Sequence, residues 1–268
     1  MKKVINAILF LCACALAWIC VGSIVDDQEV DAQIDARKKV VIARLLDIKK
    51  AQEAYKELHD TTLIYYDEEG ATDGAEPEMK TANFGCYAES FDILIDFLKT
   101  ARYPEKIVKE GYIQEGAQRK GWTDAKVANH IWQLRQSGMS DDAIREQLKG
   151  EDLPGVWCDT IWAENPIQTI LGRADYPVDS LRYIPFSDEE DGQLKEFEMR
   201  ADVHFKMKVP MYYAMQCEAH YNTFLSKEKG TANNKRKNLV QYEEERGNFP
   251  GLKIGDLTNW NNNAGNWE

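Results

Sequence analysis

In this sequence, the spacing that most resembles a pair of metal ligands is that of a cysteine and a histidine three positions apart. They are Cys217 and His220, in the run Cys-Glu-Ala-His, and His204 lies upstream. On one helical turn, a cysteine sulfur and a histidine nitrogen at this spacing can share a zinc ion. Such a site needs further ligands, and the sequence holds only this one pair. We therefore expect a buried cysteine near a surface histidine, and we predict no metal ligand.

Two acidic loops offer carboxylate and carbonyl oxygens, which are the ligands that calcium prefers. They run from Asp67 to Glu78 and from Asp188 to Asp191. Neither has the alternating oxygen donors of an EF-hand loop, so we interpret both as solvated charge. The sequence also lacks a Gly-x-Ser-x-Gly elbow, a glycine-rich phosphate loop and a His-Glu-x-x-His pair. We predict no catalytic residue and no cofactor, and we do not expect an enzyme.

The longest apolar stretch runs from Val4 to Val25, carries no charge and follows Lys2 and Lys3. An apolar run longer than about 18 residues can cross a bilayer as a helix. We therefore predict a transmembrane signal anchor over residues 1–25. By the positive-inside tendency, the two lysines keep the N-terminus cytoplasmic, and about 240 residues lie in the periplasm or outside the cell.

Other fates of this run stay open. Leu11 to Cys14 resembles a lipoprotein processing box, which would make Cys14 a lipidated N-terminus. Ala13 to Ala15 and Ala15 to Ala17 resemble signal peptidase sites. A buried helix of a soluble protein is a further alternative. The chain stays apolar beyond these points, as far as Val25, and this favours an uncleaved anchor.

The net charge limits the classes of partner that we expect the chain to bind. The cysteines bear on whether a disulfide can form. The residues after Val25 hold 31 basic and 45 acidic side chains, a net charge of −14. This balance disfavours nucleic acid and anionic membrane surfaces, which need clustered lysine and arginine. Outside the cytoplasm, Cys86, Cys158 and Cys217 could form one disulfide and leave one thiol, and the pairing stays open.

The segment from Asp26 to about residue 60 is rich in charge and has the pattern of an amphipathic helical stalk. Its apolar residues recur at spacings of three, four and seven, which places them on one helix face. This stripe could pack on the protein's own domain, or part of it could also contact neighbouring copies. The residues that we predict for self-association are Ile34, Val41, Leu45, Ile48 and Tyr55.

Residues 61–268 have the mixed pattern of an α+β domain. Strict alternation from Phe197 to Phe205 predicts a half-buried strand. Helix caps at Thr123 and Ser140 predict a helical insertion over about residues 105–150, and Ser90 is expected to cap another helix. Further strands are expected over residues 61–66, 156–162, 181–186 and 209–217, and a helix over residues 234–246.

A resemblance to known proteins begins at the end of the stalk. Residues 48–55, Ile-Lys-Lys-Ala-Gln-Glu-Ala-Tyr, follow an apolar N-terminal segment, and this arrangement resembles type IV pilins and pseudopilins. The resemblance implies a long N-terminal helix, half in the membrane, packed on an antiparallel sheet. The chain departs from pilins because it has no Gly-Phe-Thr-Leu leader junction and no glutamate early in the apolar segment.

Other phrases resemble an uncharacterised group of single-pass envelope proteins from gut bacteria. They are residues 90–97, 181–186, 249–253 and 261–268. This resemblance brings no known activity with it. The pilin-like helix implies a structural or assembly protein of the cell envelope, whose partners are the membrane and other copies or envelope proteins. Two alternatives are a lipoprotein without a filament role and an anchored module that binds a peptide or glycan through exposed Trp157, Trp162 or Trp260.

Overall fold

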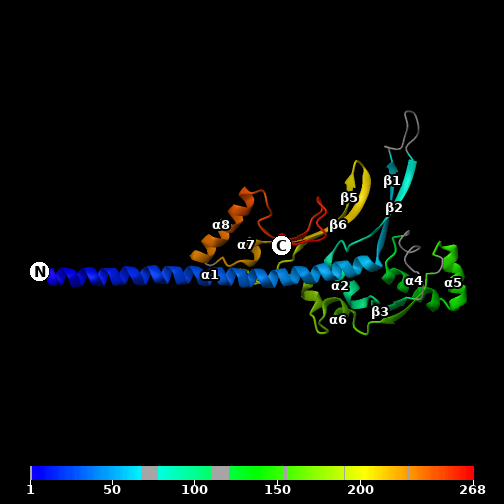
Figure 1. Cartoon of the computed structure of the whole chain (residues 1–268), viewed down its shortest axis with the longest axis horizontal. Helices are drawn as coiled ribbons and strands as arrows, with labels where there is room; N and C mark the ends of the chain where they lie inside the picture. The colour runs from blue at the N-terminus through cyan, green and yellow to red at the C-terminus, as the bar shows by residue number, and fades with distance from the viewer. Residues whose placement is uncertain (1, 68–77, 110–120, 154–155, 190, 228–229) are drawn as a thin grey trace, which may run out of the picture. The chain divides into compact units, whose positions relative to one another are not determined.

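The computed structural model describes most of the chain. It leaves out residues 1, 68–77, 110–120, 154–155, 190 and 228–229, and the side chains of residues 2–9, 17, 19–24, 67, 78 and 109. The described elements combine helices with antiparallel strand pairs, so the predicted α+β class is confirmed (Figure 1). The predicted acidic loop from Asp67 to Glu78 falls mainly outside the described residues.

One helix, α1, runs from Lys2 to Leu58 and contains 57 residues. No proline interrupts it, and at its full size it extends for roughly 85 Å. At its C-terminal end, the N–H of His59 donates to the carbonyl of Tyr55 at 3.1 Å, and strand β1 begins at Asp60. The predicted stalk is therefore helical to its end and belongs to the same helix as the apolar run.

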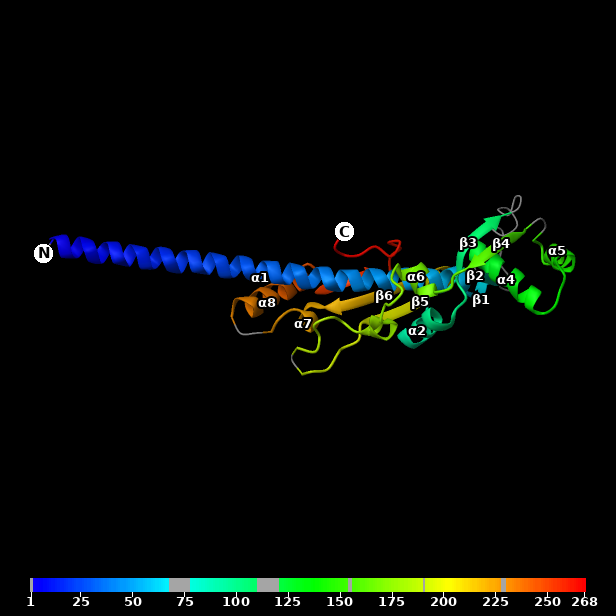
Figure 2. The same ribbon diagram turned by 90° about the horizontal axis from the view of Figure 1, so that it is seen from below.

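Most side chains of the predicted anchor, residues 1–25, lie outside the described residues. In the part of the chain that the structure describes, no helix is both long enough and apolar enough to cross a bilayer. The described side chains at the start of α1 are exposed, and Trp18 has 82% of its surface free. In both views, the two helices at residues 221–224 and 231–245, labelled α7 and α8, lie beside a later part of α1 than this (Figures 1 and 2).

The chain divides into two compact units. Unit 1 comprises Met1–Ala43, Tyr183–Glu196 and Ala219–Leu252, and unit 2 comprises Arg44–Arg182, Phe197–Glu218 and Lys253–Glu268. In unit 1, residues 27–38 of α1 contact helices α7 (Tyr221–Phe224) and α8 (Thr231–Glu245). Lys235 joins α8 to α1, because its Nζ forms ion pairs with the carboxylates of Asp27 at 2.9 Å and Asp31 at 2.6 Å.

Unit 2 holds two short antiparallel pairs. Strand β1 (Asp60–Asp67) pairs with β2 (Glu78–Gly85), and β3 (Pro104–Lys109) pairs with β4 (Cys158–Trp162). Helix α2 (Phe91–Thr100) begins at the predicted cap, where Ser90 accepts from the N–H of Ile93. Three shorter elements are also described: α6 (Pro166–Leu171), the 3₁₀ helix η1 (Val178–Arg182) and β7 (Gly251–Gly255).

Three further strands form one sheet with the order β5-β6-β7. Strand β5 (Glu198–Lys206) and β6 (Val209–His220) form an antiparallel hairpin, which confirms the alternation-based prediction. Gly255 adopts a left-handed φ of 72°, and a Cβ there would lie 2.1 Å from the carbonyl oxygen of Met215. A side chain is therefore excluded at this close approach to β6.

The predicted helical pair is present as α4 (Asp124–Gln136) and α5 (Asp141–Gly150), capped by Thr123 and Ser140 as expected. These helices do not form a core by themselves. Strand β4 and the residues before it join them, and the buried cluster consists of Val127, Ala128, Ile131, Ile144, Leu148, Leu153, Val156, Trp157 and Cys158. Residues 110–120 of the predicted insertion lie outside the described residues.

The strand predicted over residues 181–186 is wrong. Residues 178–182 form η1, and Tyr183 makes only an isolated bridge to Glu196. Phe186 adopts a left-handed φ of 66°, which is incompatible with a regular strand. Residues 183–186 instead begin a loop in unit 1, which is closed where the N–H of Ile184 donates to the carbonyl of Lys195 at 2.8 Å.

Candidate ligand pocket

The structure gives other contacts to the three residues considered as metal ligands, which are Cys217, His220 and His204. Cys217 is buried in β6, and burial raises the pKa of its thiol. His220 caps α7, because its Nδ1 accepts from the N–H of Asn222 at 3.0 Å. His204 stacks on the ring of Tyr212, with 4.8 Å between the centroids. Among the described residues, no group of three or more potential ligands is arranged to hold a metal ion.

The three tryptophans considered for ligand binding differ in exposure. Trp157 is buried, with the guanidinium of Arg145 at 3.9 Å from its ring, so the expectation that it is exposed is wrong. Trp162 is half-buried beside Trp132. Trp260 has 57% of its surface exposed and meets the ring of Tyr212 edge-on at 5.0 Å. Only Trp260 among these three has the exposure that a surface contact needs.

Of the five residues predicted for self-association, four are buried and one is half-buried. Val41, Leu45 and Ile48 have no exposed surface, Ile34 has little, and Tyr55 is half-buried. Tyr55 stacks on His59 at 3.8 Å within its own chain. Packing within the chain, one of the two interpretations of the stripe, therefore accounts for these side chains, and self-association through them stays a prediction.

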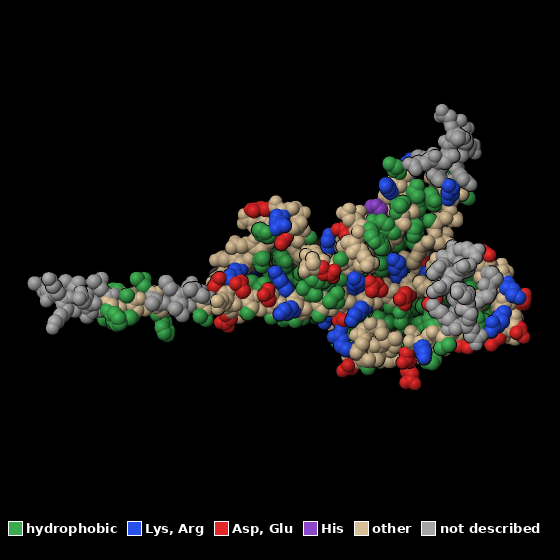
Figure 3. All heavy atoms as spheres, in the orientation of Figure 1, with side chains coloured by type: hydrophobic (Ala, Val, Ile, Leu, Met, Phe, Trp, Pro, Cys, Tyr) green, Lys and Arg blue, Asp and Glu red, His purple; other side chains and the backbone are tan. Residues whose placement is uncertain are grey.

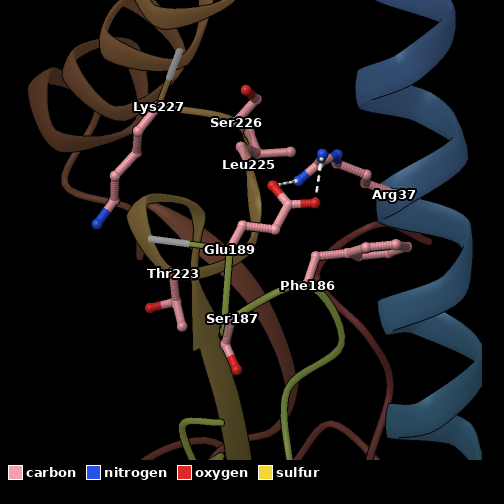
Figure 4. Close-up of a pocket in the computed structure, with 8 residues that line it drawn as sticks. All are labelled: Arg37, Phe186, Ser187, Glu189, Thr223, Leu225, Ser226 and Lys227. Carbon is pink, nitrogen blue, oxygen red and sulfur yellow. Dashed lines mark hydrogen bonds and ion pairs between the residues drawn. The ribbon is translucent and has the colours of Figure 1, made fainter. Parts of the chain in front are cut away.

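A cavity of about 540 Å³ lies in unit 1 and brings together three segments that are distant in the sequence (Figure 4). Helix α1 contributes one residue, the loop of residues 183–196 contributes three, and the segment around α7 contributes four. The lining residues are Arg37, Phe186, Ser187, Glu189, Thr223, Leu225, Ser226 and Lys227.

The loop of residues 183–196 has a hydrogen bond between its two arms and one residue with a left-handed backbone conformation. The buried hydroxyl of Ser187 accepts from the N–H of Lys195 at 2.8 Å, which ties the two arms of the loop together. The left-handed backbone at Phe186 redirects the chain. In Figure 4, the side chains of Phe186 and Glu189 extend toward α1, whereas the side chain of Ser187 does not.

Arg37 is the central polar group of the pocket. Its Nη1 donates to Oε2 of Glu189 and its Nη2 donates to Oε1, both at 2.7 Å (Figure 4). Nη1 also donates to the carbonyl oxygen of Phe224 at 3.0 Å. The guanidinium lies over the ring of Phe186, 4.9 Å from its centroid. Two hydrogen bonds to one carboxylate and a stacked ring fix the plane of the guanidinium.

The lining offers charged, hydroxyl and apolar groups to a ligand. It holds the cations Arg37 and Lys227, the carboxylate Glu189, three hydroxyl groups and two large apolar side chains. None of the described lining residues is a histidine or cysteine that could act as a base or nucleophile at neutral pH. The volume lies within the range of about 300–1,000 Å³ that is typical of small-molecule sites.

Sequence reasoning missed this pocket. Arg37 belongs to the charged side of the stalk, and Glu189 lies in the loop interpreted as solvated charge. The two are 152 positions apart, and no local pattern predicts that they meet. A second cavity of about 610 Å³ lies between α1 and α8 in unit 1, with lining residues Asp31, Ile34, Asp35, Lys38, Lys235, Asn238, Leu239 and Tyr242.

In unit 2, a lysine lies near two aromatic rings, one buried and one exposed. The space-filling view shows hydrophobic and charged side chains interleaved over the described surface (Figure 3). Lys56 lies 4.6 Å from the ring centroid of Tyr87 and 5.9 Å from that of Trp260. The amide of Asn263 donates to the hydroxyl of Tyr87 at 2.8 Å, which positions the C-terminal segment.

Comparison with known proteins gives no further assignment. No family model, curated protein or solved structure matches this chain.

Proposed function

We propose that this chain is a membrane-anchored structural or assembly protein of the bacterial envelope, pilin-like in role, with its folded part outside the cytoplasm. The observation that carries the proposal is the contrast between two parts of α1. Leu45 and Ile48 are buried within the protein, whereas Phe10, Leu11 and Trp18 expose most of their surface. One helix thus combines a core segment with an apolar segment that has no described cover.

The exposure of the apolar segment favours a lipid environment. Apolar surface in water costs about 25 cal/mol per Å², and a row of large exposed side chains is therefore unfavourable unless something covers it. Lipid tails would cover Phe10, Leu11 and Leu16 all around the helix. Trp18 and Val25 are exposed as well, and Asp26 and Asp27 follow directly, which supports a membrane boundary near this point.

Two variants of α1 test the anchor. Leu16→Arg places a charge inside the apolar run, which costs roughly 2.5–3.5 kcal/mol near the centre of a membrane helix. We expect this variant to leave the membrane fraction in part or entirely. Val40→Arg is the matched control, because Val40 is an exposed apolar residue of the same helix beyond the run. Equal membrane retention of both variants would contradict the anchor.

The N-terminus of the natural protein separates the anchor from its alternatives. An intact N-terminus, measured by mass spectrometry, supports the uncleaved anchor. A lipid on Cys14 supports a lipoprotein, and a start beyond Ala17 supports cleaved export. Either of the last two results would overturn the pilin-like arrangement, because the apolar half of α1 would then be missing.

Self-association is the second part of the proposal and needs its own measurement. Crosslinking in intact cells should give dimers or larger species through the apolar part of α1. The same crosslinking of the Leu16→Arg variant should lose these species. Monomer alone in the unaltered protein would contradict an assembly role while leaving the anchor in place.

A second candidate function is an anchored ligand-binding module. The pocket around Arg37 favours it, since this cavity combines an oriented guanidinium with hydroxyl and apolar lining. The exposed ring of Trp260 offers an alternative contact surface in unit 2. Capture of one ligand by monomeric protein, without filaments in membrane extracts, would favour this function over the first.

A further inference from the structure

Glu189 occupies the position on Arg37 that a carboxylate of a ligand would take. Guanidinium and carboxylate form two parallel hydrogen bonds, each 2.7 Å long. This two-point geometry is the one through which arginine recognises carboxylates in binding sites. In Figure 4, the Glu189 side chain extends from the loop across the pocket to reach Arg37. The chain therefore supplies its own carboxylate to this site.

Two groups besides Glu189 contact the guanidinium. Its Nη1 also donates to the carbonyl of Phe224, and its flat face lies on the ring of Phe186. Both contacts come from groups other than the loop carboxylate. Removal of Glu189 from the pocket would thus leave a guanidinium that is still oriented and has two donor positions available for an incoming carboxylate.

The contact between Glu189 and Arg37 is accessible to a competitor. The side chain of Glu189 is 46% exposed and that of Arg37 is 21% exposed. Water screens an ion pair with this degree of exposure and weakens it, even where two hydrogen bonds join the partners. A ligand that forms the same two hydrogen bonds and adds other contacts can therefore displace the loop carboxylate.

The remaining lining indicates what else the ligand carries. Arg37 and Lys227 give two positive charges against one negative charge from Glu189, so displacement of Glu189 leaves a net charge of +2 among the described lining residues. Phe186 and Leu225 present apolar surface next to the guanidinium (Figure 4). The pocket is complementary to an acid group attached to a small apolar body.

We propose that this pocket binds a ligand with a carboxylate beside an apolar group, and that Glu189 is an internal competitor for Arg37. The C-terminus of a short peptide and a small aliphatic acid share this chemistry. The inference rests on the second candidate function, the ligand-binding module, and does not depend on the membrane anchor.

Calorimetric titration of the full chain in detergent tests the site. The probes are N-acetyl-alanyl-leucine, its C-terminal amide, and isovalerate. We expect the peptide acid to bind and the amide not to bind. Isovalerate binding with equal affinity identifies a small acid as a sufficient ligand, whereas binding of the peptide acid alone identifies a peptide C-terminus.

Variants of the ion pair decide whether Glu189 competes. Glu189→Gln should tighten acid binding by about 5-fold, because it removes the competing charge. Arg37→Lys keeps the positive charge but cannot donate two parallel hydrogen bonds to one carboxylate, so it should weaken binding by roughly tenfold. Glu244→Gln, an exposed carboxylate of α8 outside the pocket, is the matched control and should leave the dissociation constant unchanged.

Three results would overturn the proposal: no binding of either acid, equal binding of acid and amide, or no gain in affinity with Glu189→Gln. Failure of the pocket is distinguishable from failure of the binding function. If the protein retains a ligand after Arg37→Lys but loses it after Trp260→Ala, the ligand-binding function stands and its site lies in unit 2.

Discussion

Gln52 and Ala88 exchange two hydrogen bonds in the buried part of unit 2. The side-chain Nε2 of Gln52 donates to the carbonyl of Ala88 at 2.9 Å, and the N–H of Ala88 donates to Oε1 at 2.8 Å. Gln52 has no exposed surface. A buried amide is tolerated in a core only when its polar atoms have partners. This pair therefore joins α1 to the segment after β2 in one register.

We predict that Gln52→Leu lowers the free energy of unfolding of unit 2 by roughly 2–4 kcal/mol, since it leaves the N–H and carbonyl of Ala88 buried without these partners. The midpoint of urea denaturation of the full chain in detergent measures the change. Gln28→Leu is the control, because Gln28 is exposed on the same helix. Similar midpoints for both variants would contradict the role of the exchanged pair.

Two adjacent leucines of α1 give a test of the buried stripe. Leu45 has no exposed surface, and Leu46 is 37% exposed. Leu45→Ala should lower the free energy of unfolding by about 2–5 kcal/mol, because it removes apolar contacts and leaves a cavity.

Leu46→Ala removes the same atoms from a partly exposed site, so it should cost less than about 1 kcal/mol. The urea midpoint of each variant is again the measurement. If Leu46→Ala proves as costly as Leu45→Ala, then Leu46 is covered in solution, and a contact with another copy of the chain becomes the explanation to test.

The elements that were predictable from the sequence are those set by local chemistry. Phe197 to Phe205 alternates in polarity, and the strand β5 follows it almost residue for residue. Ser90, Thr123 and Ser140 each accept a backbone N–H at the start of a helix, as expected from their side chains. Periodicity and caps act over a few residues, so a single sequence is sufficient to predict them.

The site depends on contacts that no local pattern encodes. The apolar residues 181–186 have strand-like composition, but the left-handed backbone at Phe186 and the closed loop prevent a strand. Arg37 and Glu189 each have the pattern of ordinary surface charge. The contact between these two side chains depends on the path of the loop in the tertiary structure. The burial of Trp157 also depends on tertiary packing, because helices α4 and α5 pack over β4.

Asp256 gives the protein an acid-sensitive contact in its C-terminal segment. Its carboxylate accepts from the hydroxyl of Thr258 at 2.6 Å, from the N–H of Thr258 at 2.8 Å, and from Nζ of Lys253 at 2.9 Å. Burial opposes ionisation, but these hydrogen bonds outweigh it and hold the pKa of Asp256 well below its ordinary value of about 3.8. The stabilisation is therefore complete above that value and is lost as the pH falls below it.

We predict that Asp256→Asn lowers the free energy of unfolding by roughly 1–2 kcal/mol at pH 7. Below about pH 4, the difference from the unaltered protein should shrink, because Asp256 then binds a proton in the unfolded chain while the folded state still holds it ionised. Urea midpoints between pH 3 and pH 7 measure both effects. Asp175→Asn is an exposed control, and a difference that stays constant across this range would contradict the assigned role.

The cysteines of the folded part should differ in reactivity. Cys86, Cys158 and Cys217 are free, and burial raises the pKa of each thiol. Cys217 has no exposed surface and Cys158 has almost none, whereas Cys86 is half-buried. Because alkylation requires an accessible thiolate, Cys217 and Cys158 should react only after local opening.

We predict that iodoacetamide at pH 7.5 labels Cys86 roughly tenfold or more faster than Cys217 in the folded chain, since labelling of the buried thiol has to wait for such an opening. Peptide mass spectrometry measures each rate, and the same reaction in urea is the control, in which the rates should converge. Cys12 and Cys14 are exposed on α1 and are followed as separate peptides. If Cys217 reacts as fast as Cys86 without urea, strand β6 is not buried in solution.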